Sequence, residues 1–213
     1  SLRTKNRIAV PPMVCFHWAD DSGLMTEKHL KHYHDMARGG AGLIIAEATA
    51  VTKRGRLHAT NLGLWEDGQV EGFARLADTV HKYDPPLLVQ LLHAGLNGID
   101  PEADAPSDYE VIREGRIAIR GHEMSQSRID ETIEDFVKAA LRARKAGLDG
   151  IELHGCHSYL FSQFMSSIVN KRTDVYGEQK HKLALDTLKA IRQACGSGFT
   201  VGIRLAAFEP TLE

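Results

Sequence analysis

The feature that most constrains the fold is a repeated alternation of apolar segments with amphipathic segments. Residues 42–48, 87–93 and 199–205 are largely apolar runs without regular polar alternation, as expected of strands covered on both faces. A shorter apolar run ends at Pro11, and another spans Ile151–Leu153. Strand and helix alternate five times along the chain. Because parallel strands need long crossover connections, this order predicts a parallel α/β sheet.

Four helical segments separate these strands. Their apolar residues recur at intervals of three and four, and we expect helices from Thr26 to Gly39, over 70–80, from Ser127 to Gly147 and over 183–194. The first of these helices carries three histidines. Helical spacing places only His29 and His32 close together, so we interpret them as solvated surface residues rather than a metal site.

Two further features of the sequence bear on the fold class and on the position of the site. No G-x-G-x-x-G motif follows the first strand, which disfavours the doubly wound dinucleotide fold and favours a (β/α) barrel. The stretch from Ala94 to about Glu123 is rich in Gly, Pro and Asp and is too long for a plain connection. We interpret it as a loop that covers or binds a substrate, because long loops in compact domains are usually functional.

Charge and cysteine content exclude several classes of protein. The 213 residues carry a net charge of −2 with a pI near 6.6, which gives no electrostatic reason to expect nucleic acid or an anionic membrane as a partner. No apolar run approaches the length of a membrane span. Three dispersed cysteines form no metal-ligand spacing and indicate reduced thiols. A cytoplasmic location is expected.

The most informative motif follows the strand at 151–153. His154, His157 and Tyr159 lie directly after it, at spacings of three and two residues. In a parallel α/β fold, catalytic side chains collect at the carboxyl ends of strands. Two imidazoles could hold a carbonyl or anionic oxygen, and the phenol could deliver a proton. Equally, these side chains could be satisfied polar groups and a packed ring at a strand end.

Five segments, in order and across essentially the whole chain, resemble the Old Yellow Enzyme family of NADH:flavin oxidoreductases. The matching segments are Lys5–Met13, Gly42–Ala50, Gln90–Gly95, Ala146–Leu160 and Asn170–Gly177. Each segment alone is a weak signal, whereas the five together are specific. The resemblance implies an FMN-dependent ene-reductase on a TIM (β/α)8 barrel, with residues 1–213 forming the N-terminal part of a single FMN-binding domain.

The resemblance also implies a cofactor site. Pro12 and Met13 would line the flavin with backbone groups, and Ala48 would contact its ring system. Gln90 would bond the pyrimidine edge, and Arg204 would place a positive charge near the N1–C2 carbonyl region of the flavin. Taken singly, Gln90 could instead be a satisfied core amide and Arg204 an ion-pairing barrel residue. No residue is assigned to a metal.

The implied reaction is reduction of an activated C=C bond in a small α,β-unsaturated carbonyl compound, with NAD(P)H as the electron source. His154 and His157 would bind the substrate carbonyl, with His154 also close to the flavin, while Tyr159 would donate a proton to the α-carbon. Hydride would pass from flavin N5 to the β-carbon. Cys15 is given no flavin contact, because Val14 occupies the position directly after Pro-Met and Cys15 should point the other way.

The chain departs from the family pattern most clearly in length. A TIM barrel needs about 250 residues and eight strands, whereas only about five βα units can be traced here, and strands six to eight are not found. Without the phosphate-binding loops of the last strands, the chain is expected to bind FMN weakly or not at all. Its open edges predict homo-oligomers.

Two alternatives to the flavoenzyme interpretation stay open from the sequence. One is a truncated barrel without flavin binding or activity. The other is a metal-dependent TIM-barrel hydrolase that uses His93, His154 and His157, for which Glu47 is the obvious carboxylate ligand.

Overall fold

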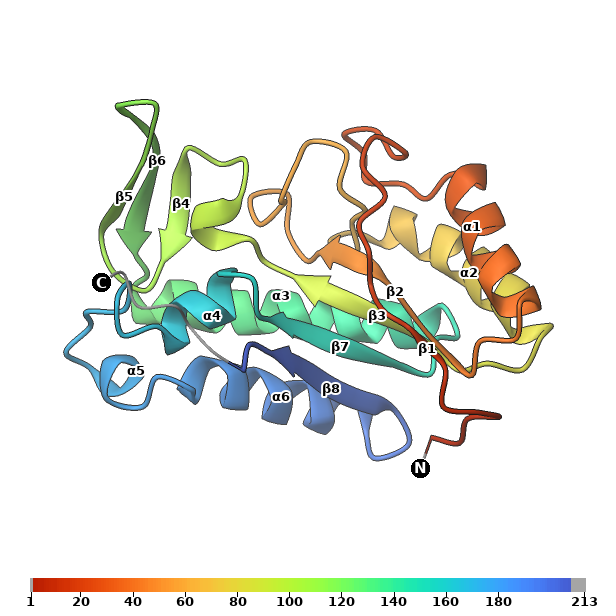
Figure 1. Ribbon diagram of the computed structural model, residues 1–213. Helices are drawn as coiled ribbons and strands as arrows, with labels where there is room; N and C mark the ends of the chain where they lie inside the picture. The colour runs from red at the N-terminus through yellow and green to blue at the C-terminus, as the bar shows by residue number, and fades with distance from the viewer. Residues whose placement is uncertain (1, 208–213) are drawn as a thin grey trace.

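Five parallel strands form the main sheet of the protein in the computed structural model, which describes residues 2–207. The strands are β1 (Ala9–Val10), β2 (Leu43–Ala50), β3 (Leu87–Leu92), β7 (Gly150–Gly155) and β8 (Thr200–Leu205). They lie side by side in the order β1-β2-β3-β7-β8, and every pairing is parallel (Figure 1). The predicted parallel sheet and its five strands are confirmed.

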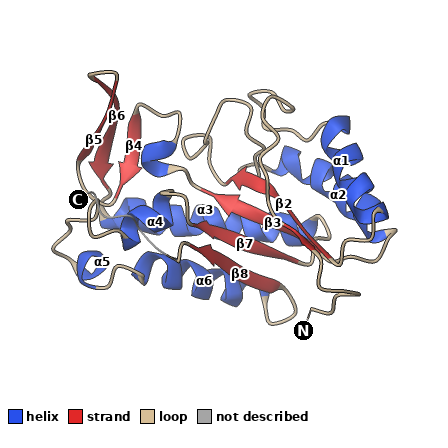
Figure 2. Ribbon diagram, viewed as in Figure 1, coloured by secondary structure: helices blue, strands red, loops and turns tan. Residues whose placement is uncertain are grey.

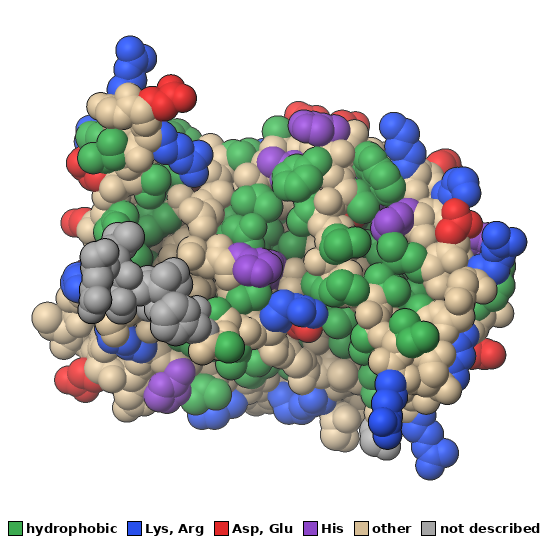
Figure 3. All heavy atoms as spheres, viewed as in Figure 1, with side chains coloured by type: hydrophobic (Ala, Val, Ile, Leu, Met, Phe, Trp, Pro, Cys, Tyr) green, Lys and Arg blue, Asp and Glu red, His purple; other side chains and the backbone are tan. Residues whose placement is uncertain are grey.

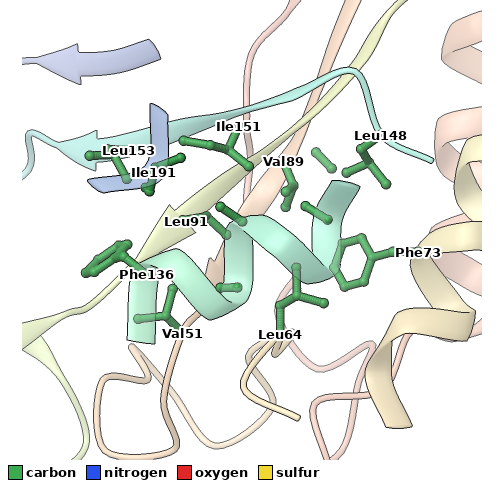
Figure 4. Close-up of a cluster of buried hydrophobic side chains, with 14 of the residues drawn as sticks. Val51, Leu64, Phe73, Val89, Leu91, Phe136, Leu148, Ile151, Leu153 and Ile191 are labelled. Atoms are coloured by element: carbon green, nitrogen blue, oxygen red, sulfur yellow. The ribbon is translucent and has the colours of Figure 1, made fainter. Parts of the chain in front are cut away.

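Four long helices connect these strands, as predicted. They are α1 (Glu27–Arg38), α2 (Val70–His81), α3 (Gln126–Lys145) and α6 (Lys182–Cys195) (Figure 2). Their apolar faces and the sheet enclose one large cluster, in which Phe73, Leu91, Phe136 and Ile151 are at most 1% exposed (Figure 4). Strand residues of alternate parity therefore point away from these helices, toward the site described below.

The stretch from Ala94 to Glu123, expected to be a loop, contains a second small sheet. The 3₁₀ turn η2 (Gly95–Asn97) leads into β4 (Glu102–Ala105), followed by the hairpin of β5 (Tyr109–Arg113) and β6 (Arg116–Glu123), in the order β4-β6-β5. The hairpin extends away from the main sheet (Figure 1). A separate apolar cluster of Leu96, Ala103, Ala105 and Ile119 supports it. The sequence did not predict this sheet, because the stretch is rich in Gly and Asp, which are rare in strands.

One local prediction needs correction, and three short elements were not predicted. Helix α3 begins at Gln126, because the hydroxyl of Ser125, not Ser127, caps it by accepting the Arg128 N–H at 3.2 Å. Between β7 and α6 the chain forms two short helices that the sequence did not indicate, α4 (Leu160–Met165) and α5 (Val175–Glu178). A further 3₁₀ turn, η1 (Asp67–Gln69), precedes α2.

The interpretation of His29 as a surface residue was wrong. His29 is 0% exposed because it lies on the same face of α1 as the buried Leu30 and Tyr33. Its Nδ1 accepts the backbone N–H of Thr26 at 3.1 Å, which completes the capping box at the start of the helix. His32, in contrast, is partly exposed.

The arrangement of layers distinguishes between the two α/β architectures. A doubly wound sheet has helices on both faces, whereas barrel strands have helices on the outer face only. Here α1, α2, α3 and α6 share the cluster on one face of the sheet, so the five units form part of a (β/α) barrel. Among residues 2–207, no helix combines the length and the apolar character that crossing a membrane requires.

Candidate active site

A cavity of about 430 Å³ opens at the carboxyl ends of the parallel strands, on the side of the sheet away from the helices. Its volume lies in the range of small-molecule sites. The cavity is lined by Pro11, Pro12, Met13, Val14, Phe16, Ala48, Leu57, Gln90, His154, His157, Tyr159 and Arg204. All eight residues that the sequence assigned to cofactor or substrate are among them. In Figure 3, hydrophobic, histidine and basic side chains meet near the centre of the face shown.

One carboxylate organises the polar part of this cavity. Glu152 accepts a hydrogen bond from the Gln90 amide nitrogen at 2.8 Å and from Arg204 Nε at 2.9 Å. Strand register explains the contact, because Gln90 pairs with Glu152 across β3 and β7. Arg204 follows on β8, paired with His154. Gln90 is therefore a buried amide and Arg204 an ion-pairing residue, and both also line the cavity.

Two histidines and a tyrosine form the other wall. The ring of His154 lies 4.6 Å from that of Tyr159, at 88°, and 5.2 Å from that of His157. Burial, with smaller effects from His157 and Arg204, lowers the pKa of His154 to about 4, so its imidazole is neutral near pH 7. Burial also raises the pKa of Tyr159, which keeps its phenol protonated.

The loop that presents these rings has a strained backbone. His157 and Ser158 both have φ of 58°, a left-handed conformation that non-glycine residues rarely adopt, and strain of this kind concentrates at functional sites. The carbonyl of Ser158 accepts hydrogen bonds from Gln163 Nε2 at 2.6 Å and Asn97 Nδ2 at 2.9 Å. These two amides hold the loop in a geometry that the isolated sequence would not prefer.

The ligands proposed for a hydrolytic metal site do not come together. His93 Nε2 lies 3.4 Å from Asp104 Oδ2, and Glu47 faces His29 on α1; neither His93 nor Glu47 lines the cavity. The potential ligand atoms of His154, Cys156 and His157 do lie within 4.8 Å of one another. That set contains no carboxylate, so it does not match the hydrolase site considered from the sequence.

Sequence reasoning gave no role to Glu152 or to the lining residues Pro11, Val14 and Leu57. Glu152 was not singled out, although it stands two positions before His154 and must share its face of β7. Leu57, which lines the cavity from the loop after β2, gave no signal in the sequence. Cys15, as expected, does not line the cavity.

A parallel sheet with helices on one face and a cavity at the carboxyl ends of its strands defines the class of (β/α)-barrel proteins. The sequence profile of the NADH:flavin oxidoreductase / NADH oxidase family matches residues 1–213. The chain belongs to this family.

Individual relatives agree with the assignment. The chain is 40% identical over 193 residues to an NADPH dehydrogenase of Listeria monocytogenes serotype 4a, covering 89% of this chain and 56% of that protein. An NADPH dehydrogenase of Bacillus pumilus is 37% identical over 193 residues, with the same coverage of 89% and 56%. The chain thus spans just over half the length of these relatives.

Solved structures show the same fold. Old Yellow Enzyme from Pichia sp. AKU4542 superposes with a TM-score of 0.88 at 31% identity, covering 95% of this chain and 56% of that one. The Old Yellow Enzyme homologue from Zymomonas mobilis gives 0.87 at 28% identity, covering 96% and 61%. The predicted TIM-barrel class is confirmed.

The polar groups of the cavity fit a flavin. A flavin pyrimidine edge alternates N–H donors with carbonyl acceptors, and the Gln90 amide offers both kinds of partner. Its nitrogen is bonded to Glu152, while its oxygen accepts no hydrogen bond from residues 2–207. The Arg204 guanidinium is paired with Glu152 at 2.9 Å, and its side chain is 37% exposed, so it would be accessible to the negative charge of a reduced flavin.

Proposed function

We propose that the protein is an FMN-dependent oxidoreductase that reduces the activated C=C bond of an α,β-unsaturated carbonyl compound with electrons from NAD(P)H. One observation carries the proposal. The residues assigned to cofactor and to substrate lie on the five strands of the main sheet or on the loops that follow them, yet all of them line the same cavity. Bound FMN would supply the hydride chemistry.

The cofactor side of the cavity is formed by β1, β2, β3 and β8. Pro12, Met13 and Ala48 line this side and would contact the ring system of the flavin. Gln90 would bond its pyrimidine edge, and Arg204 would stabilise the negative charge of the reduced ring. Glu152 keeps both of these side chains oriented through its hydrogen bonds at 2.8 and 2.9 Å.

The substrate side is formed by the exit loop of β7. Neutral His154 donates one imidazole N–H to the substrate carbonyl oxygen, and His157 donates a second hydrogen bond to the same oxygen. The two donors draw electron density from the alkene and make its β-carbon electrophilic. Tyr159, whose pKa is raised by burial, remains protonated and transfers its phenolic proton to the α-carbon.

Isotope labelling tests the proton step. The chain, FMN, NADPH and a cyclic enone are combined in D2O, and deuterium is located in the product by NMR. We expect deuterium at the α-carbon, and a loss of about 10²–10⁴-fold in the rate for Tyr159→Phe. Tyr109→Phe, on the exposed hairpin strand β5, is the matched control and should retain the full rate. Equal rates for the two variants would contradict the role of Tyr159.

A second part of the proposal concerns the domain to which residues 1–213 belong and the association of copies of the chain. We propose that residues 1–213 act as part of a single barrel domain and that the outer strands β1 and β8 of the sheet promote association of copies. Light scattering coupled to gel filtration measures the association, and a monomer at all concentrations contradicts it. FMN fluorescence titration separates a flavoenzyme from a barrel that has lost its cofactor.

A further inference from the structure

A buried carboxyl group lies beside the cavity without lining it. Strand β2 pairs with β3 through Ala46 and Ala48, and the register shifts between them, so Glu47 is the extra residue of a β-bulge. Bulges next to active sites redirect a side chain that regular alternation would point elsewhere. Glu47 is 1% exposed. Its neighbour Ala48 lines the cavity.

The Glu47 side chain joins two elements that are distant in sequence. Its Oε2 accepts the backbone N–H of Cys15 at 2.9 Å. Its Oε1 lies 3.5 Å from Nε2 of His29 on α1. Because His29 Nδ1 accepts the N–H of Thr26, the ring hydrogen is on Nε2 and points to the carboxyl group. The backbone N–H of Glu47 donates to the hydroxyl oxygen of Tyr33 at 2.8 Å.

The segment that Glu47 contacts forms one wall of the cavity. Residues 11–14 and Phe16 line it, whereas the Cys15 side chain does not. Two prolines in this segment have no N–H to donate. The backbone N–H of Cys15 donates to the side chain of Glu47 on β2. Among the described residues 11–16, this hydrogen bond ties the backbone of the segment to the main sheet. Met13 and Phe16 are each more than half exposed, and the other contacts at this end of the segment are the Phe16 ring at 4.5 Å from that of His58 and the His17 N–H bonded to Thr60 Oγ1 at 3.1 Å.

The energetics favour a functional reason for this arrangement. A buried carboxyl group with one weakly paired oxygen is costly, and an apolar residue of similar size would be cheaper at this position. Glu47 Oε1 and His29 Nε2 have no hydrogen-bond partner within normal distance among the described residues. Core packing therefore does not account for the pair, whereas the fixed position of Cys15 does.

We propose that Glu47, supported by His29, is a positioning residue that orders the segment from Pro11 to Phe16 as the cofactor-facing wall of the cavity. The identity of the ligand rests on the proposed function, but the ordering of the segment does not. Glu47 touches neither cofactor nor substrate; it acts through the Cys15 backbone and through Ala48, its neighbour on β2.

Amide hydrogen exchange in the cofactor-free chain is the direct test. Glu47→Ala should speed exchange in the peptide containing residues 13–16 about tenfold, because a protected backbone donor loses its acceptor. Glu47→Gln keeps an acceptor oxygen and should restore protection. His29→Gln keeps an acceptor for the capping box and removes the imidazole N–H that faces Glu47, so it should speed exchange in the same peptide by less than Glu47→Ala does. This variant replaces Glu47→Ala if Glu47→Ala does not fold.

A matched control lies at the opposite end of the sheet. Asp149 accepts the backbone N–H of Leu87 at 2.8 Å and faces His81 at 2.9 Å, so it repeats the contacts of Glu47 far from the cavity. Asp149→Ala should lower stability but leave exchange of residues 13–16 unchanged. The proposal is overturned if Glu47→Ala exchanges within twofold of wild type, or if Asp149→Ala speeds the same peptide equally.

FMN fluorescence titration then tests whether the ordered segment from Pro11 to Phe16 contributes to cofactor binding. Glu47→Ala should weaken FMN binding at least tenfold, with Glu47→Gln close to wild type and Asp149→Ala unchanged. Faster exchange without weaker FMN binding would refute the assignment of this wall to the cofactor. If the wild-type chain binds no FMN, the alternative of a barrel without flavin binding holds for residues 1–213 and the proposed function fails for them, while the exchange result still decides whether Glu47 orders the segment.

Discussion

Replacing the two members of the Glu47–His29 pair one at a time should give opposite dependences of stability on pH. Burial raises the pKa of Glu47 from 4.5 to about 7, and burial, with a smaller effect from His32, lowers that of His29 from 6.5 to about 4. Between about pH 4.5 and 6.5, the folded pair holds its proton on Glu47. The unfolded chain holds that proton on His29. The two effects therefore cancel in the wild-type protein.

Each substitution removes one side of this cancellation. The folded state binds more protons at Glu47 than the unfolded chain does, so the contribution of Glu47 to stability is present below pH 4.5 and is lost toward pH 7. His29 has the reverse sign, because its neutral form is favoured by folding, and its contribution grows as pH rises from about 4 to 6.5. Each pKa difference of about 2.5 corresponds to about 3 kcal/mol.

Urea unfolding at a series of pH values measures both effects. Relative to wild type, Glu47→Gln should gain about 3 kcal/mol between pH 4.5 and 7, and His29→Gln should lose about 3 kcal/mol between pH 4 and 6.5. Differences from wild type remove the titrations that the proteins share. Of the other groups at the pair, Cys15 has its pKa raised to about 12 and stays protonated throughout. Two flat curves, or two of the same sign, would refute the reasoning.

Three other substitutions test separate parts of the structure. Ser125→Ala should cost about 1 kcal/mol in the free energy of unfolding because α3 loses its cap, whereas Ser127→Ala should be neutral; equal losses in urea unfolding would refute the assigned cap. Phe136→Ala should cost about 3–5 kcal/mol, measured the same way, because its ring is 0% exposed and packs 4.9 Å from that of Phe161. Arg204→Gln should weaken FMN binding and make the flavin potential more negative, and an unchanged potential by redox titration would contradict its electrostatic role.

Local periodicity explains which elements the sequence predicted. The strands at Leu87 and Thr200 and the helices after Thr26 and Val70 have strong apolar patterns, and all four appear in the structure. The β4-β6-β5 sheet lacks such a pattern because β5 and β6 are mostly exposed and hold little apolar surface. A hairpin of this kind is stabilised by the contacts that its base makes, which a local pattern does not record.

The sequence also did not predict side-chain contacts between strands. The sequence assigned Gln90 and Arg204 to the cofactor through a resemblance, and the structure adds that Glu152 joins them. That contact depends on the register of three strands, because Gln90 and Arg204 lie 62 and 52 residues from Glu152 in the sequence. The burial of His29 could have been predicted, because helical spacing places it one turn from Tyr33 on the buried face of α1. The roles of His154, His157 and Tyr159 remain predictions.

The small β4-β6-β5 sheet has a consequence for the divergence of this protein. It is inserted between β3 and α3, has its own apolar cluster, and is fastened by the buried Asp104, which bonds Arg128 at 2.9 Å. Other ion pairs, among them Arg54 with Asp100 at 2.9 Å, hold the base of the insertion, so its outer hairpin can change in length and sequence without disturbing the barrel strands. We therefore expect natural variants and laboratory libraries to tolerate substitution in the hairpin from Tyr109 to Glu123 far more readily than in β3 or β7.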